Sequence, residues 1–293
     1  MIRILEKLTI WYCRVCGLIL FASVFSMLAH LIFRGAGVMD MKLIFGETAP
    51  LKALFLEQAV FKGLFPAIAG TILLVCLSVS IAVPIGFSTG IYLAEYANPP
   101  VKRLFNIVFD ILAAIPSILV GLFGFALALF LHKHYSQNIR PCLLISSLAL
   151  AFLILPYIIR TTQAALEGIP TDVRLTALSL GATKLQNIFY VLLPKSLSAL
   201  IGGVILAIGR CAEDTAVIML TGVVVMAGVP KSLFSTYEAL PFYIYYISSQ
   251  YSNPDELLSG YAAALILLII CLSLFALAFV IKKQLTYLAF YRP

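Results

Sequence analysis

Charged residues are scarce in this chain, because Asp, Glu, Lys and Arg together make up only 11% of its 293 residues. Soluble domains carry about 25% charged residues. Hydrophobic residues make up 62% of the chain, and its mean hydropathy is +1.06. A soluble fold of this size could not bury so much apolar surface, so the composition excludes a soluble protein and predicts an all-α membrane protein.

Patterns for nucleotide hydrolysis, metal binding and covalent catalysis are also missing. The sequence has no GxxxxGK[ST] motif to hold nucleotide phosphates. Cys13 and Cys16 form a CxxC in the first apolar run, but no second pair or histidine cluster accompanies it, so we interpret the cysteines as small hydrophobic residues. Glu95, Asp110 and Glu167 are dispersed and have no neighbouring histidine, which argues against a membrane enzyme. We therefore expect no catalytic residue, no metal site and no cofactor bound by this chain.

The basic residues indicate a membrane topology. They are scattered, not clustered as in nucleic-acid-binding proteins, although the net charge is +7. The long apolar runs predict six spans, at residues 10–33, 64–93, 105–131, 141–159, 197–227 and 259–281. Twelve Lys and Arg then lie in inner segments and seven in outer loops, which predicts that both termini are cytoplasmic.

This topology divides the chain into three parts. Residues 1–63 hold the first span and an external loop, with a short amphipathic helix expected near 51–61. Residues 64–281 form the transmembrane core, which includes a cytoplasmic loop at 161–196, and residues 282–293 are a short cytoplasmic tail. An aromatic-rich segment at 238–246 is expected to be re-entrant or interfacial. In the third span, Gly121 and Gly124 are expected to let another helix approach closely.

The cytoplasmic loop predicts two short helices joined by a tight bend. Thr171 and Asp172 can cap a first helix that starts near Val173, and Gly181 can end it in a left-handed conformation. Thr183 can cap a second helix. Its apolar side would carry Leu185, Ile188, Phe189 and Leu192.

The spacing in this loop resembles the EAA loop of binding-protein-dependent ABC importer permeases. Gly181 is followed after nine residues by Val191-Leu192-Leu193-Pro194, where the family has I-x-L-P. Leu175 stands where the family has the Glu of the EAA triplet. The resemblance implies a type I ABC importer permease whose loop docks on an ATPase subunit. The residues it assigns to that coupling are Ala177, Gly181, Ala182, Leu193 and Pro194.

Three charged residues fall inside the fifth predicted span. A central Arg in a membrane helix costs about 2.5–3.5 kcal/mol on insertion scales. Arg210 is followed at i+3 by Glu213 and at i+4 by Asp214, so both acids can reach its guanidinium. One interpretation is a self-neutralised ion pair that only holds helices together. The other is an anion gate, in which the planar guanidinium binds a tetrahedral oxyanion.

The surrounding residues resemble phosphate-specific ABC permeases. Gly209-Arg210 followed by Asp214-Thr215-Ala216 is similar to that family's G-R-x-x-x-E-T-A segment, with Asp214 at the Glu position and Glu213 where many members have Gly. Segments 90–97, 115–124 and 169–183 also match, in order. The resemblance implies a substrate pathway for inorganic phosphate that includes Arg210, Glu213, Asp214 and Thr215.

The resemblance also implies partners and a location. It favours the PstA-type permease, which would pair with a PstC-type permease, two copies of a PstB-type ATPase that uses ATP and Mg, and an external PstS-type phosphate-binding protein. The expected location is the inner membrane of a prokaryote, surrounded by lipid. Two alternatives stay open: a permease for sulfate, molybdate, tungstate or a phosphonate, which needs the same Arg chemistry, and a membrane scaffold that transports nothing.

Overall fold

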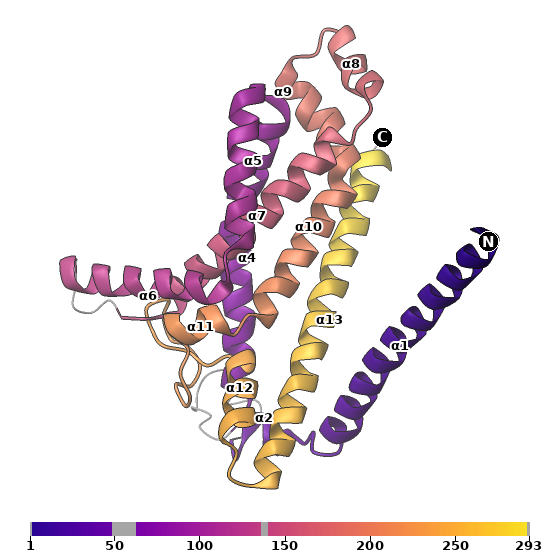
Figure 1. The fold of residues 1–293 in the computed structure, drawn as a ribbon. Helices are drawn as coiled ribbons and strands as arrows, with labels where there is room; N and C mark the ends of the chain where they lie inside the picture. Colours follow the sequence, from indigo (N-terminus) through magenta and orange to yellow (C-terminus); the bar gives the residue numbers. More distant parts are fainter. Residues whose placement is uncertain (1, 49–62, 136–139, 292–293) are drawn as a thin grey trace.

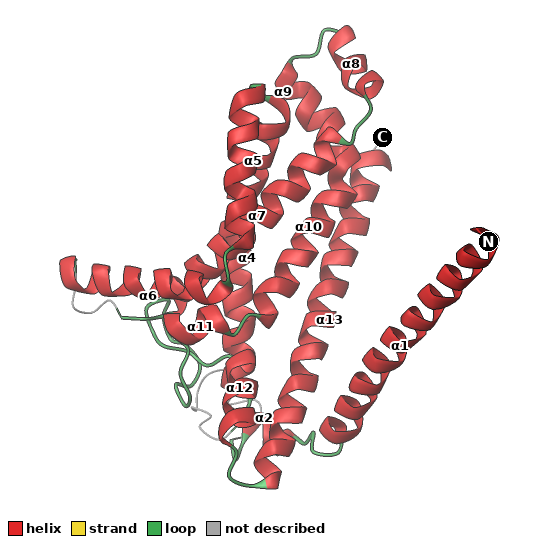
Figure 2. Cartoon of the chain, viewed as in Figure 1, coloured by secondary structure: helices red, strands yellow, loops and turns green. Residues whose placement is uncertain are grey.

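The computed structural model describes residues 2–48, 63–135 and 140–291, and their regular secondary structure is helical (Figure 2). One isolated β-bridge joins Val223 and Tyr237. In chain order the elements are α1 (Ile2–Ala36), α2 (Met41–Phe45), α4 (Phe65–Glu95), α5 (Pro99–Ala114), α6 (Ser117–His134), α7 (Leu143–Glu167), α8 (Thr171–Ser179), α9 (Lys184–Asn187), the π-helical turn η1 (Ile188–Leu192), α10 (Leu193–Glu213), α11 (Ala216–Thr221), α12 (Leu240–Gln250) and α13 (Pro254–Tyr291). The expected helix near 51–61 lies outside the described residues.

Six helical stretches in the described part are long and apolar enough to cross a membrane. They are Leu5–Ala36, Phe65–Glu95, Ser117–His134, Leu143–Glu167, Lys184–Glu213 and Pro254–Leu285. This confirms the predicted all-α class and the predicted number of spans. Helices α4, α7, α10 and α13 form the body of the bundle. Helix α1 stands to one side, and the C-terminal end of α1 contacts α13 (Figure 1).

The most extensive packing joins α4 to α7. Glycines on α4 let the two backbones approach, since a Cβ added at Gly90 would lie 2.5 Å from Cβ of Thr162. Gly86 meets Ile158 in the same way one turn away. The main apolar core lies along this contact and includes Leu150 and Ile154 of α7, both fully buried. Helices α4 and α7 are therefore held together as one unit.

The third predicted span, 105–131, is wrong as a single helix. Helix α5 ends at Ala114, Ile115 is extended at φ −66° and ψ 127°, and α6 begins at Ser117. Pro116 explains the break, because proline has no N–H and pushes the residue before it out of the helical region. Helix α6 then runs at a steep angle to the other long helices (Figure 1).

The fifth predicted span, 197–227, is also broken. Helix α10 ends at Glu213, and Asp214 takes an extended conformation with φ −75° and ψ 119°. The short helix α11 follows and lies against α6. There a Cβ added at Gly124 would lie 2.6 Å from Cγ2 of Thr221, which confirms the predicted close approach at the α6 glycines. The charged cluster thus lies at a helix end and not in the middle of a helix.

The two ends of the bundle differ. One end, here called the α8 end, carries α8 and α9, and the opposite end carries α2 and α12 (Figure 1). The aromatic-rich segment at 238–246 forms the start of α12, which packs against α4 and α13. Its first residue, Leu240, is fully buried, and the Leu240 N–H donates to Oγ1 of Thr71 at 2.9 Å. This segment is therefore part of the helix bundle.

Candidate functional site

The loop at the α8 end forms the two short helices that the sequence predicts. Gly181 separates them in a left-handed conformation, with φ +84°. Thr183 and Gln186 form a capping box at the start of α9, with the Gln186 N–H donating to Oγ1 of Thr183 at 3.3 Å. The expected cap of the first helix is wrong: α8 begins at Thr171 directly after Pro170, and no side chain caps it.

The loop is shorter than the predicted range 161–196. Helix α7 continues to Glu167, and the chain is helical again from Lys184 onward, so residues 168–183 form the projecting part. Of the predicted coupling residues, Ala177, Gly181 and Ala182 lie in this projection, where the Ala177 carbonyl accepts the Ala182 N–H at 3.1 Å. Leu193 and Pro194 lie below it, at the start of α10.

The projecting loop presents apolar side chains that this chain does not cover. Helix α8 has no fully buried residue. The expected apolar side of the second helix is divided, because Ile188 and Leu192 are buried while Leu185 and Phe189 are exposed. The exposed large apolar residues within 171–192, here called the loop face, are Leu175, Leu178, Leu180, Leu185, Phe189 and Tyr190. They are available to a partner.

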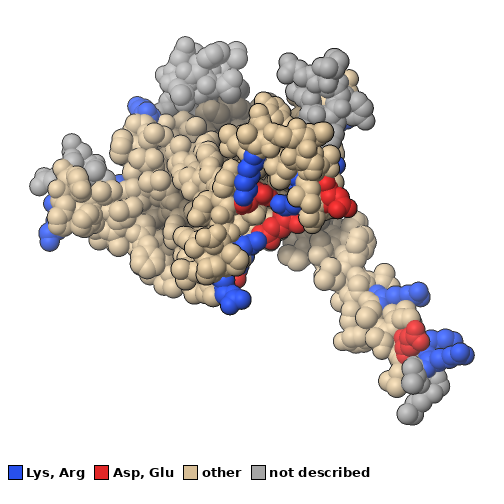
Figure 3. All heavy atoms as spheres, turned by 90° about the horizontal axis from the view of Figure 1, so that it is seen from above, with Lys and Arg blue, Asp and Glu red and all other residues tan. Residues whose placement is uncertain are grey.

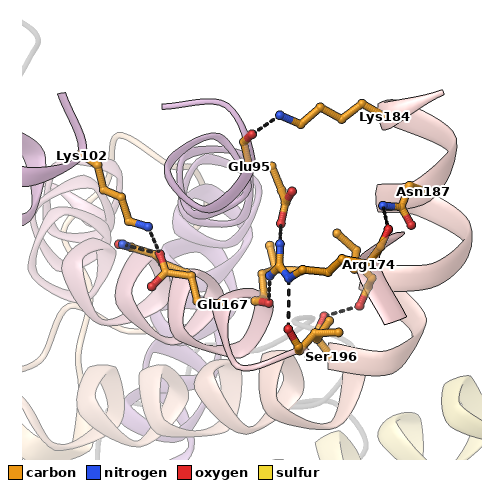
Figure 4. A network of polar contacts seen from close by, with 11 residues as sticks. Glu95, Lys102, Glu167, Arg174, Lys184, Asn187 and Ser196 are labelled. Carbon is orange, nitrogen blue, oxygen red and sulfur yellow. Dashed lines mark hydrogen bonds and ion pairs between the residues drawn. The ribbon is translucent and has the colours of Figure 1, made fainter. Parts of the chain in front are cut away.

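An ion pair that the sequence analysis missed fixes the base of α8. Nη1 of Arg174 lies 2.5 Å from Oε1 of Glu95, the last residue of α4 (Figure 4). Nε of Arg174 donates to the Ile169 carbonyl at 3.1 Å, and Nη2 donates to the Leu166 carbonyl. One guanidinium thus joins α8, the end of α7 and the end of α4.

Further polar contacts surround this pair. Nδ2 of Asn187 donates to the Arg174 carbonyl at 3.0 Å, and Nζ of Lys184 donates to the Glu95 carbonyl (Figure 4). Lys102 of α5 pairs with Glu167 of α7 at 2.8 Å. Viewed from above the α8 end, acidic and basic side chains lie intermixed near the middle of this face (Figure 3). The charged partners, Arg174 with Glu95, Lys184 with Glu95 and Lys102 with Glu167, are far apart in sequence, so no local pattern reveals them.

The charged cluster of α10 forms a second site. Nη1 of Arg210 lies 3.0 Å from Oε1 of Glu213, which confirms the i+3 pairing. The i+4 pairing with Asp214 is wrong: this buried carboxylate accepts the Val217 N–H at 2.9 Å and so caps α11. The Thr215 carbonyl accepts the first helical bond of α11, from the Met219 N–H at 3.0 Å.

The Arg210–Glu213 pair points away from this chain. The side chains of Arg210 and Glu213 are 43% and 64% exposed, and Leu206, one turn earlier, is 67% exposed. Residues 206, 210 and 213 share one side of an α-helix. The chain therefore leaves a charged face of α10 uncovered.

Two cavities between the long helices of the described bundle have apolar walls. The one between α4, α10 and α13 has a volume of about 410 Å³ and is lined by residues such as Val79, Leu200 and Leu274. A second, of about 550 Å³, lies between α5, α6 and α7 and is lined by residues such as Phe123 and Phe152. Neither set of walls includes a charged residue, so neither cavity supplies a cationic partner for an anion.

Comparison with known proteins places this arrangement in a family. The model of the binding-protein-dependent transport system inner membrane component matches residues 86–287, which include both the loop face and the Arg210–Glu213 pair. The chain belongs to this family. The family description names an inner membrane component of a transport system, and the six candidate spans agree with a membrane component.

Relatives of this inner membrane component include named phosphate permeases. The phosphate transport system permease protein PstA of Mycobacterium leprae is 30% identical over 226 residues, covering 74% of this chain and 70% of the relative. PstA of Pasteurella multocida is 30% identical, and the match covers 76% of this chain and 78% of that relative. The probable ABC transporter permease protein YqgI of Bacillus subtilis is 24% identical and covers 97% of this chain and 98% of its own length.

Solved structures of ABC importers share the fold of this inner membrane component. A chain of a bacterial ABC transporter involved in alginate import aligns with a TM-score of 0.61 at 15% identity, covering 94% of this chain and 99% of that one. A chain of the MetNI methionine transporter in an inward-facing conformation aligns with a TM-score of 0.56 at 19% identity, covering 82% and 100%. The type I importer permease fold expected from the sequence is confirmed.

Proposed function

We propose that this chain is a PstA-type permease that forms half of the path for inorganic phosphate in an ATP-driven importer. The observation that carries the proposal is the uncovered Arg210–Glu213 pair, together with the phosphate permeases among the relatives. The importer would contain a PstC-type permease, two copies of a PstB-type ATPase and an external PstS-type binding protein. It would lie in the inner membrane of a prokaryote.

The position of the charged pair supports a route through the membrane. From Lys195 to Arg210, α10 climbs about 22 Å at about 1.5 Å per residue. With Lys195 at the membrane surface, Arg210 would therefore lie within an apolar bilayer core about 30 Å thick. Ionisable side chains at such depth face a protein interior or a water-filled path, and they rarely face lipid. The second permease would therefore cover this face and enclose the path between the two chains.

The chemistry at this face suits a transient anion site. A guanidinium presents several N–H donors in a plane, which match two oxygens of a tetrahedral oxyanion. Glu213 holds Arg210 when no anion is present, and an arriving phosphate would compete with it for the guanidinium. Such a site binds weakly, because a transport path has to release what it binds. Asp214 and Thr215 would shape the path by fixing the start of α11.

The loop face would dock on the ATPase. Its exposed apolar side chains fit a hydrophobic groove, and the ATPase would supply ATP, Mg and hydrolysis. The α8 end is then cytoplasmic together with both termini, and the α12 end is external and faces the binding protein. On this account closure of the ATPases moves α8, and the membrane helices switch access to the phosphate path.

Uptake measurements with competing anions test the substrate. We would express the operon that contains this chain in cells without their own importer and measure entry of radiolabelled phosphate. The proposal predicts uptake that excess sulfate and molybdate do not reduce. Entry of sulfate or molybdate in place of phosphate would retain the permease and reject the substrate. Entry of no anion at all would favour a membrane scaffold.

A further inference from the structure

The Arg174–Glu95 pair is the most buried ion pair among those in the described residues. The two side chains are 21% and 10% exposed, whereas those of Lys102 and Glu167 are 32% and 38% exposed. Solvent-exposed ion pairs contribute little, but removing one partner of a buried pair leaves an uncompensated charge and is strongly destabilising locally. This contact is therefore expected to stay closed while the protein works.

Helix α8 has little else to fix its position. It has no fully buried residue, and among its apolar side chains the partly buried Val173 joins the small core made by Leu166, Ile169 and Ile188. Arg174 follows directly and donates to two backbone carbonyls at the end of α7 as well as to Glu95. The guanidinium of Arg174 therefore provides most of the directed side-chain contacts that join α8 to the ends of α4 and α7.

Helix α9, which follows the projecting loop, contacts the same residues. Asn187 donates to the Arg174 carbonyl, and Lys184 donates to the Glu95 carbonyl while its Nζ lies 4.6 Å from the centre of the Tyr96 ring. Helices α8 and α9, on either side of the bend at Gly181, therefore both contact the C-terminal end of α4 (Figure 4). A displacement of the loop would act on α4 at this end.

We propose that Arg174 and Glu95 are positioning residues that transmit the movement of α8 to the joined helices α4 and α7. The proposal rests on the proposed function as an importer permease. Helix α7 also packs against α10, so a shift of the α4–α7 unit reaches the helix that carries Arg210. The pair does not touch the transported anion. Its role is to couple ATP hydrolysis to transport.

The complete transporter in proteoliposomes tests this role. We would purify the chain with its second permease, its ATPase and its binding protein, and measure phosphate taken up per ATP hydrolysed. Arg174→Gln and Glu95→Gln are each expected to lower this ratio at least tenfold, while the ATPase still co-purifies. The double variant should fall no further, since both changes break one contact. Arg174→Lys should be intermediate, because an ammonium cannot replace all three directed bonds.

Lys102→Gln is the matched control, because it breaks an ion pair at the same end of the bundle without touching α8. The phosphate taken up per ATP hydrolysed by Lys102→Gln should stay within about twofold of the value for the unsubstituted transporter. Three results would overturn the proposal: an unchanged ratio in Arg174→Gln, an equal loss in Lys102→Gln, or loss of the ATPase from the Arg174→Gln complex. The last would assign Arg174 to docking and not to transmission.

A distance measurement separates this proposal from the choice of substrate. Spin labels would be placed at the exposed residues Ser88 on α4 and Ser179 on α8, with the exposed native cysteines replaced by serine. One narrow label-to-label distance, the same with and without trapped ATP, is expected for the unsubstituted transporter, and a broad distribution for Arg174→Gln. A change of that distance on ATP trapping would overturn the proposal. A transporter that carries no phosphate would reject only the proposed function.

Discussion

Glu238, at the α12 end, is a single carboxyl group whose surroundings disfavour its charge. Burial raises the pKa of Glu238, and N–H donors of Gly228 and Ala227 lower it by a smaller amount. The Gly228 N–H donates to Oε1 at 2.8 Å. The folded protein therefore holds this proton more tightly than the unfolded chain, in which the pKa of a Glu is about 4.3.

The sign of this shift predicts a pH dependence of stability. The contribution of Glu238 is fully present below about pH 4.3, the unfolded pKa, and is lost as the pH rises through the raised folded pKa. Glu238→Gln, which resembles the protonated form, should flatten that part of the profile. Melting temperatures of both forms in detergent across this pH range check the prediction, and parallel profiles would contradict it.

Gly222 shows how a single backbone position constrains the fold. It adopts φ +147°, and an added Cβ would lie 2.5 Å from the Cys142 backbone nitrogen. Gly222→Ala should therefore destabilise the chain by more than about 1 kcal/mol. Gly202 of α10 has no atom within 4 Å of an added Cβ, so Gly202→Ala should be neutral or stabilise by up to about 1 kcal/mol. Chemical denaturation in micelles would measure both, and equal effects would count against this reading.

Among the elements, α8 provides a test of docking. Leu175, which the resemblance to the EAA loop aligns with a Glu, is 52% exposed, whereas Leu180 is 84% exposed. Leu175→Glu should be tolerated, since the position faces outward and the resemblance implies a Glu there. Leu180→Asp should reduce recovery of the ATPase several-fold, because it puts a charge into an apolar contact.

Co-purification of the ATPase with tagged permease measures both effects. Thr176→Asp is a suitable control, since Thr176 is exposed on the same helix but is already polar. If Leu175→Glu abolished recovery of the ATPase, residue 175 would not face the ATPase in the way proposed. Normal recovery with Leu180→Asp would remove the loop face from the contact.

The elements differ in how well the sequence predicts them. Gly181 and Thr183 act on their immediate neighbours, so the bend and the capping box can be read from local residues. The break at Asp214 cannot, because an apolar run looks the same whether it holds one helix or two. Pro116 was visible, but proline also occurs inside continuous helices, as Pro84 does in α4.

In the candidate sites, too, contacts between neighbouring residues could be predicted from the sequence, and contacts set by the tertiary structure could not. The pairing of Arg210 with Glu213 is a three-residue spacing and was predictable, whereas the use of Asp214 as a cap depends on where α10 ends. The contact between Arg174 and Glu95 depends on α4 and α7 being parallel neighbours that end at the same level. Only the tertiary structure supplies that information.

At the scale of the whole molecule, the chain is incomplete by itself. It leaves an ion pair exposed on a membrane helix, an apolar loop face at one end, and a first helix that packs mainly against α13. The proposed partners would cover the ion pair and the loop face, and lipid can cover the apolar first helix. The architecture therefore agrees with one subunit of a larger importer, with the phosphate path between two permeases and hydrolysis in separate subunits.

The central claim is that phosphate crosses the membrane past Arg210. The most direct test is uptake of radiolabelled phosphate by cells that lack their own importer and carry the operon with this chain, with Arg210→Gln, or with the control Arg103→Gln. Arg103 is exposed at the α8 end and belongs to no ion pair described above. At equal membrane abundance, we predict uptake with the unsubstituted chain and with Arg103→Gln, and at least a tenfold loss with Arg210→Gln. Equal uptake by all three would contradict the claim and leave the Arg210–Glu213 pair a structural contact.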